Sequence, residues 1–130
     1  MDLVLDNPGD SLFVRSVTAE GIQVGDELYR KPIVLNAEQV IDEYPIFSIE
    51  QLTEQNLGGL LSLQPDVVLI GTGAQQQFLQ PRQLMFFYSR NMGVEVMNTY
   101  AACRTFNVLV SELRNVAAVL IPIQSPNGSS

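Results

Sequence analysis

The apolar residues follow different patterns in the two halves of the chain. In the first half they form short runs separated by turns that contain glycine, which is typical of consecutive β-hairpins. We expect strands over residues 11–17, 22–24, 27–29 and 31–36. Pro32 places the last of these at a sheet edge or near a strand start.

The second half alternates continuous apolar runs with longer amphipathic stretches. A continuous apolar run is expected for a strand of a parallel sheet that is covered on both faces. The short joins between the elements mean right-handed crossovers, which predicts three parallel strands. We expect strands over residues 67–70, 94–97 and 116–121, and helices over residues 82–92 and 100–113.

Local signals set the expected helix boundaries. Pro81 suits the first turn of one helix, and Gly93 suits its C-terminal stop. A further helix is expected to begin after Thr53, whose hydroxyl can cap it, and to run to about Leu63. Two glycines inside this range weaken that helix by about 1 kcal/mol each.

Length and composition agree with one folded unit. The chain has 130 residues, of which 46% are hydrophobic and 16% are charged. This length lies near the common domain size, and no linker rich in Gly, Pro or Ser divides the chain. We therefore expect a single α/β domain over residues 1–124 and a flexible C-terminal tail over residues 125–130.

The residue inventory excludes several kinds of active site. The chain contains no His and one Cys, so it can hold no His general base, no internal disulfide and no multi-thiolate metal site. No pair of carboxylates is placed for acid–base chemistry. We therefore expect no catalytic residue, no metal and no cofactor, which favours a non-enzymatic protein.

The net charge of −7 is unevenly distributed along the chain. Residues 1–65 carry eleven acidic and three basic side chains, whereas residues 66–130 carry three acidic and four basic ones. The acidic excess indicates either a solvated surface that aids solubility or a face that steers a basic partner. Nucleic-acid binding is not expected from such a charge. Without a targeting segment or a long apolar run, we expect a cytoplasmic protein that does not insert into membranes.

Two loops are predicted to meet beyond the carboxyl ends of the parallel strands, where α/β sheets bind ligands. Glycines allow a ligand to approach the backbone closely, and a helix N-terminus with an arginine favours an anion. The alternative is that the glycines only form a tight strand exit and that the arginine lies on a solvated helix face. The residues expected in this crevice are Gly71, Thr72, Gly73, Asn98, Thr99 and Arg104.

The helix expected over residues 82–92 has more apolar residues than one buried face needs. Arg82, Phe86 and Arg90 are spaced by four residues, which predicts an exposed aromatic side chain between two arginines. Aromatic residues and arginine are enriched in protein interfaces, so these three residues are our candidates for a protein contact. The alternative is a broad core stripe over which the arginine stems lie.

Cys103 is expected to be a small core residue. At helical spacing it shares a stripe with Phe106 and Val110, which points the thiol inward. A redox role is the alternative, because a helix N-terminus and Arg104 can lower the pKa of a thiol.

Several motifs of the second half are specific when they are taken together in order. They lie over residues 68–73 (VLIGTG), 93–97 (GVEVM), 99–109 (TYAACRTFNVL), 112–114 (ELR) and 117–122 (AAVLIP). With these motifs the chain resembles the family of Mth938-like domains, which includes a mitochondrial assembly factor for respiratory complex I and whose bacterial members have no assigned enzyme activity. The resemblance implies a three-layer α/β fold with a mixed central sheet and an added β-hairpin layer. The family pattern has a glycine where this chain has Leu113.

Two hypotheses for the function remain at this point. The first is a protein-binding or assembly-factor-like domain with a link to respiratory complex assembly. The second is an enzyme or sensor for a small anionic ligand, built on the crevice between Gly71–Gly73 and Thr99–Arg104.

Overall fold

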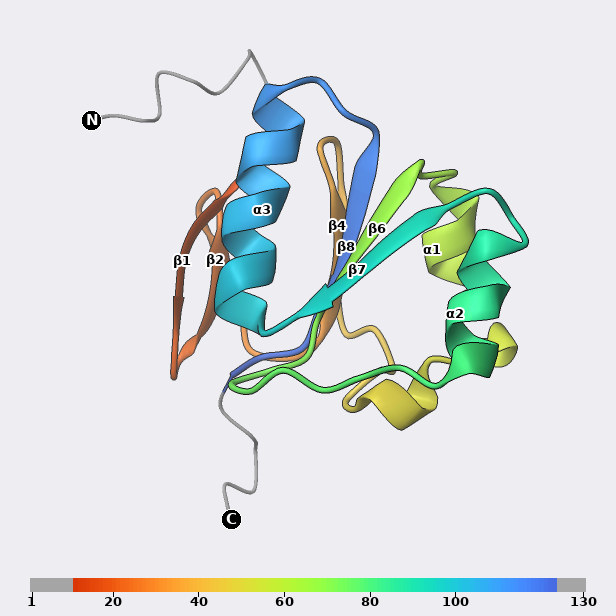
Figure 1. The fold of residues 1–130 in the computed structure, drawn as a ribbon. Coiled ribbons are helices and arrows are strands. Elements are labelled where there is room, and N and C mark those ends of the chain that lie inside the picture. The colour runs from red at the N-terminus through yellow and green to blue at the C-terminus, as the bar shows by residue number, and fades with distance from the viewer. Residues whose placement is uncertain (1–10, 124–130) are drawn as a thin grey trace.

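A mixed five-stranded sheet forms the centre of the computed structural model, which describes residues 11–123 (Figure 1). Across the sheet the order is β5 (Val40–Ile41), β4 (Ile33–Asn36), β8 (Val116–Leu120), β6 (Val67–Gly71) and β7 (Gly93–Met97). β6 pairs in parallel with both β7 and β8, whereas β4 runs antiparallel to β8 and β5. The three parallel strands predicted from the second half are thus confirmed.

Different layers cover the two faces of this sheet, so its inner strands are buried on both sides. On β6, Leu69 packs into one core cluster, and Val68 and Ile70 pack into the other. This alternation follows from the pleat of a strand and explains why the run is apolar throughout. The predicted mixed α/β fold with an N-terminal hairpin sheet is confirmed, and the arrangement of its layers is consistent with the predicted three-layer fold.

One face is covered by α3 (Thr99–Ser111) together with a separate three-stranded antiparallel sheet (Figure 1). That sheet contains β1 (Val14–Thr18), β2 (Gly21–Val24) and β3 (Glu27–Tyr29). The opposite face is covered by α1 (Gly58–Ser62), α2 (Pro81–Tyr88) and two 3-10 turns, η2 (Ile49–Gln51) and η3 (Glu54–Asn56).

Asn107 joins the hairpin layer to α3. Its amide oxygen accepts from the Val14 N–H at 2.8 Å, and its amide nitrogen donates to the Val14 carbonyl at 2.8 Å. β1 is an edge strand of its three-stranded sheet, so backbone groups on its outer side have no neighbouring strand to pair with. One side chain of α3 therefore pairs both backbone groups of Val14 at this edge.

The strand predictions of the first half hold, with small shifts at the ends. β1 begins at Val14 rather than at residue 11. Pro32 marks a strand start and not a sheet edge, since β4 follows it directly and lies between β5 and β8. The tail predicted for residues 125–130 and the ends of the predicted domain lie outside the described residues.

The helix predicted from Thr53 to Leu63 is wrong as one element, because it is divided into η3 and α1. The Thr53 side chain makes no capping hydrogen bond. The division fits a tertiary contact: the Tyr44 hydroxyl accepts from the Leu60 N–H at 3.3 Å. A Cβ atom on Gly59 would lie 3.0 Å from Cε1 of the same ring, so a glycine suits this close approach.

The end of α2 also differs from the prediction. The helix ends at Tyr88, whereas Gly93 begins β7. Asn91 takes the left-handed conformation with φ 62°, and the Met92 N–H donates back to the Phe87 carbonyl at 3.1 Å. Asparagine tolerates this conformation better than most residues, so it serves as the helix stop here.

Leu113 occupies the left-handed position that ends α3. Its φ is 63°, and its side chain is 81% exposed. The Arg114 N–H donates to the Leu109 carbonyl and the Leu113 N–H to the Val110 carbonyl, both at 2.9 Å, which is the Schellman pattern. A glycine normally takes this position, so the chain keeps the turn with a residue that is strained in it.

We expect Leu113→Gly to raise the free energy of unfolding by about 1 kcal/mol, because glycine adopts this conformation without a steric cost. Urea unfolding measures the change. Leu113→Ala is the matched control, since it removes the side chain but keeps the Cβ atom that causes the strain. An equal gain from both variants would contradict this explanation.

Candidate functional site

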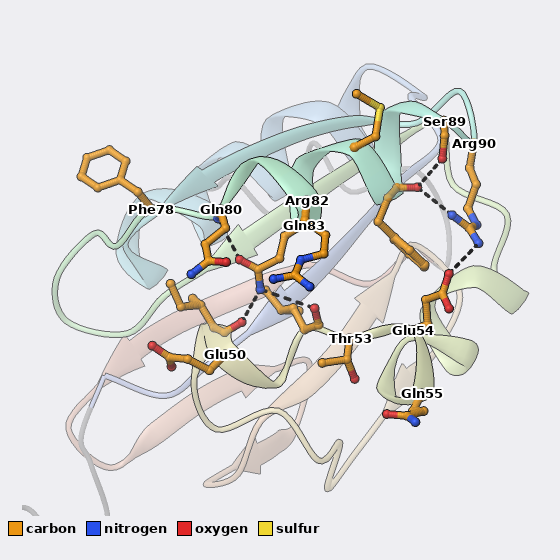
Figure 2. A pocket seen from close by; sticks show the side chains of 14 residues that line it. Glu50, Thr53, Glu54, Gln55, Phe78, Gln80, Arg82, Gln83, Ser89 and Arg90 are labelled. Atoms are coloured by element: carbon orange, nitrogen blue, oxygen red, sulfur yellow. Dashed lines mark hydrogen bonds and ion pairs between the residues drawn. The ribbon is translucent and has the colours of Figure 1, made fainter.

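An open groove of about 920 Å³ lies between α2 and the segment that carries η2 and η3 (Figure 2). Its two walls are about thirty residues apart in the sequence and meet on the face of the sheet opposite to α3. The buried residues Ile49 and Leu52 come from one wall, and Met85 and Phe86 come from the other.

Gln83 fixes the walls of the groove relative to one another. Its side-chain amide nitrogen donates to the Ile49 carbonyl at 2.7 Å and to the Leu52 carbonyl at 3.4 Å. Its side-chain oxygen accepts from the Gln80 N–H at 2.8 Å, at the start of α2 (Figure 2). The groove is thus preformed, because the same side chain bonds both of its walls.

The three residues predicted for a protein contact all line this groove. Arg82 and Arg90 are exposed, but Phe86 is half-buried and packs against the core, so the predicted exposure of Phe86 is wrong. Its ring meets the Phe87 ring edge-on at 5.3 Å between centroids, and the Arg90 guanidinium lies 3.9 Å from its centroid. The stacked arginine covers the aromatic face that the sequence suggested would be free.

Other apolar side chains of the groove are exposed instead. Phe78 is 77% exposed and Met85 is 60% exposed. Phe78 extends from the loop before α2 and points away from one end of the groove (Figure 2). Neither residue was among the candidates predicted from the sequence for a protein contact. A lone aromatic residue within a run of glutamines was the available signal for Phe78.

The loops predicted to form an anion crevice do lie together, and Thr99 connects them. Its hydroxyl donates to the Ile121 carbonyl at 2.5 Å and accepts from the Gly73 N–H at 2.8 Å. The Thr99 side chain is fully buried. A Cβ atom on Gly71 would lie 2.9 Å from the Thr99 hydroxyl oxygen, so the glycine is needed for this contact.

The remaining crevice residues also make bonds within the fold. The buried Thr72 hydroxyl donates to the Gln75 carbonyl at 2.7 Å, and the Asn98 side chain caps α3 through the Ala101 N–H at 2.8 Å. Arg104 is exposed on α3. The hydroxyls of Thr72 and Thr99 and the side-chain oxygen of Asn98 are thus already bonded to backbone groups, and the anion site stays a prediction.

Cys103 lies in the core, as predicted from its spacing. It is buried in one cluster with Phe106 and Val110. Burial raises the pKa of its thiol to about 12, and the nearby Arg104 opposes this shift only in part. The thiol is therefore protonated at neutral pH, which does not favour the redox alternative.

This shift of the thiol pKa predicts a loss of stability at high pH. An unfolded thiol ionises near pH 9, whereas the folded one stays protonated to about pH 12, so stability falls as the pH rises through this window. From pH 8 to pH 10 we expect wild type to lose about 1 kcal/mol more than Cys103→Ala does. Urea unfolding at both values measures this difference, and parallel profiles would contradict the assignment.

The fold and the groove together define the class: a three-layer α/β domain with an open, partly apolar groove on one face of its sheet. The chain belongs to the family described as a protein of unknown function (DUF498/DUF598), whose model matches residues 14–121. The resemblance to Mth938-like domains is confirmed. A Bordetella pertussis protein described as a Mth938-like domain superposes with a TM-score of 0.78 at 26% identity, covering 95% of this chain and 93% of that one.

Similar curated proteins include assembly factors from animals. The chain is 31% identical over 92% of its length to the bovine NADH dehydrogenase [ubiquinone] 1 alpha subcomplex assembly factor 3. It spans 65% of that protein's length, slightly less than two thirds. It is also 34% identical to a Francisella tularensis protein named "13 kDa major membrane protein", over 72% of this chain and 76% of that protein.

The helices of the described residues are all too short or too polar to cross a membrane. The cytoplasmic location expected from the sequence stays a prediction, because a relative carries the name of a membrane protein. Fractionation of host cells, with detection of the chain in the soluble and membrane fractions, tests it.

Proposed function

We propose that this chain is a non-enzymatic, assembly-factor-like domain that binds another protein through the groove between α2 and the η2–η3 segment. The observation that carries the proposal is the exposure of Phe78 and Met85 beside a preformed groove. Large apolar side chains with arginines around them are the usual composition of a protein-binding surface.

The relatives support a role in assembly. The animal proteins similar to this chain are named as assembly factors of NADH dehydrogenase. We propose that the bound protein is likewise a component of a respiratory complex during its assembly. The alignment with the bovine protein extends over 92% of this chain, so it includes the central residues that form the groove.

Met85→Glu is expected to abolish capture of the bound protein while leaving the fold intact. The side chain is 60% exposed on α2, so a carboxylate there remains hydrated but places a charge on the apolar contact. The tagged chain is recovered from its host at near-endogenous level, and the co-purified proteins are identified by mass spectrometry. Defined subunits of a respiratory complex are expected with wild type and absent with Met85→Glu.

Val108→Glu is the matched control for this experiment. Val108 is 52% exposed on α3, which covers the other face of the sheet, so the same charge is added away from the groove. Capture should persist in this variant. Equal capture by wild type and Met85→Glu would contradict a role for the groove.

The alternative, a small-anion-binding enzyme or sensor, uses the crevice between Gly71–Gly73 and Thr99–Arg104. It predicts that phosphate, a nucleotide or a carboxylate raises the melting temperature, since a ligand of the folded state stabilises it. Arg104→Ala should remove this response. A melting temperature that no such compound moves would contradict the alternative.

A further inference from the structure

The two arginines that line the groove differ in what they contact. The Arg90 guanidinium stacks on Phe86, donates to its carbonyl oxygen at 2.9 Å and forms an ion pair with Glu54 at 3.7 Å. Among residues 11–123, no carboxylate lies within 4.0 Å of the Arg82 guanidinium, and no described residue accepts a hydrogen bond from it. The charge of Arg90 is thus paired within the fold, whereas the exposed Arg82 has no ion-pair partner among residues 11–123.

Arg82 and Met85 lie three residues apart on α2, so their side chains are neighbours on one face of the helix. A protein segment that covers the apolar Met85 side chain therefore also removes water from the Arg82 guanidinium. The loss of this hydration is costly unless an acceptor of opposite charge replaces the water. The groove thus favours a segment that brings a carboxylate to this point.

The other charged residues that line the groove are Arg90, Glu54 and Glu50, and Arg82 is the cation of the groove that has no ion-pair partner among the described residues. Arg82 is the second residue of α2, where the helix dipole adds positive potential. The Glu54 carboxylate is already paired with Arg90. The Glu50 side chain lies toward the outer edge of the groove, where it stays in contact with water (Figure 2).

From these contacts we propose that the groove binds a protein segment with an apolar side chain against Met85 and an Asp or Glu carboxylate against Arg82. This inference rests on the proposed function and adds the charge of the partner. The net charge of −7 attracts basic partners at long range instead. The contact with Arg82 therefore predicts an acidic bound segment, whereas the net charge of the chain predicts a basic one.

Selection of short random peptides displayed on phage shows whether the groove prefers an acidic or a basic segment. The targets are the wild-type chain and the variants Arg82→Glu and Arg114→Glu. Wild type and Arg114→Glu, which changes an exposed arginine beyond the end of α3, should both select peptides with an acidic residue beside apolar ones. Arg82→Glu should select basic residues instead. A synthetic wild-type-selected peptide should bind Arg82→Glu about tenfold or more weakly, the loss expected from an unpaired buried charge.

Met85→Glu separates this inference from the proposed function. Two outcomes overturn the inference but leave the protein-binding groove in place. In the first, the selected peptides lose binding to Met85→Glu but show no preference for acidic residues. In the second, they lose binding to Met85→Glu, and selection on Arg82→Glu still favours acidic residues. Peptides that bind Met85→Glu as well as wild type overturn the groove itself. A library without any binder to wild type counts against both.

Discussion

Thr99→Val is expected to lower the free energy of unfolding by about 3 kcal/mol, because valine has nearly the same shape but cannot form hydrogen bonds. The Thr99 hydroxyl bonds both the Ile121 carbonyl and the Gly73 N–H inside the fold. Its loss leaves two backbone groups unpaired in a place that water does not reach, and each such group costs about 1–3 kcal/mol. Chemical denaturation of the purified variant measures the loss.

Thr105→Val is the control for this change, since it makes the same substitution on the same helix. Among the described residues, the one hydrogen-bond partner of the Thr105 hydroxyl is the Met97 sulfur at 3.6 Å, which is a weak acceptor. We expect this variant to stay within about 0.5 kcal/mol of wild type. Similar losses from both variants would mean that the bonds of Thr99 do not account for its effect.

Gly71→Ala should destabilise the chain by about 2 kcal/mol through overpacking. The added Cβ atom would lie 2.9 Å from the Thr99 hydroxyl oxygen, 3.0 Å from the Thr99 Cα atom and 3.1 Å from the Ala102 Cβ atom. Two of these three atoms belong to the backbone of α3 or lie next to it, so the helix must move away from β6. Thermal or urea unfolding measures the effect.

The same substitution in α1 provides the contrast. A Cβ atom on Gly58 meets nothing within 4 Å, and alanine favours a helix more than glycine does. Gly58→Ala is therefore expected to be neutral or to stabilise by up to about 1 kcal/mol. A destabilisation of both variants by the same amount would contradict the packing argument for Gly71.

The sequence was sufficient for the parts of the fold that have a strong local signal. The apolar runs at 67–70 and 116–121 predict strands buried on both faces, and both are found in the inner part of the sheet. The inward face of α3 likewise follows from the spacing of Cys103 and Phe106. These features depend on periodicity, which a single sequence contains.

The errors occur where a distant contact or a single backbone conformation determines the local structure. The segment after Thr53 is divided into two short pieces, and the Tyr44 ring packs beside the second of them. α2 ends before Gly93 because Asn91 takes a left-handed conformation that the sequence did not single out. Neither effect has a periodic signal in the sequence.

The groove was predicted only in part for the same reason. The sequence identified Arg82, Phe86 and Arg90 on one helix, but the second wall lies some thirty residues earlier. The bonds from Gln83 that join the two walls link positions that no local pattern relates. The stacking of Arg90 on Phe86, which covers the aromatic face, also requires the three-dimensional arrangement.

Site-specific photo-crosslinking tests the central claim most directly, because it reports contact at a chosen residue in the native host. A photoreactive phenylalanine analogue is placed at Met85 in the groove and, in a second variant, at Val108 on α3. Illumination at near-endogenous expression should join the Met85 variant to a defined partner protein, identified by mass spectrometry, and leave the Val108 variant free of it. Crosslinks at Val108 alone, or none at Met85 while partners still co-purify, would contradict the groove as the binding surface.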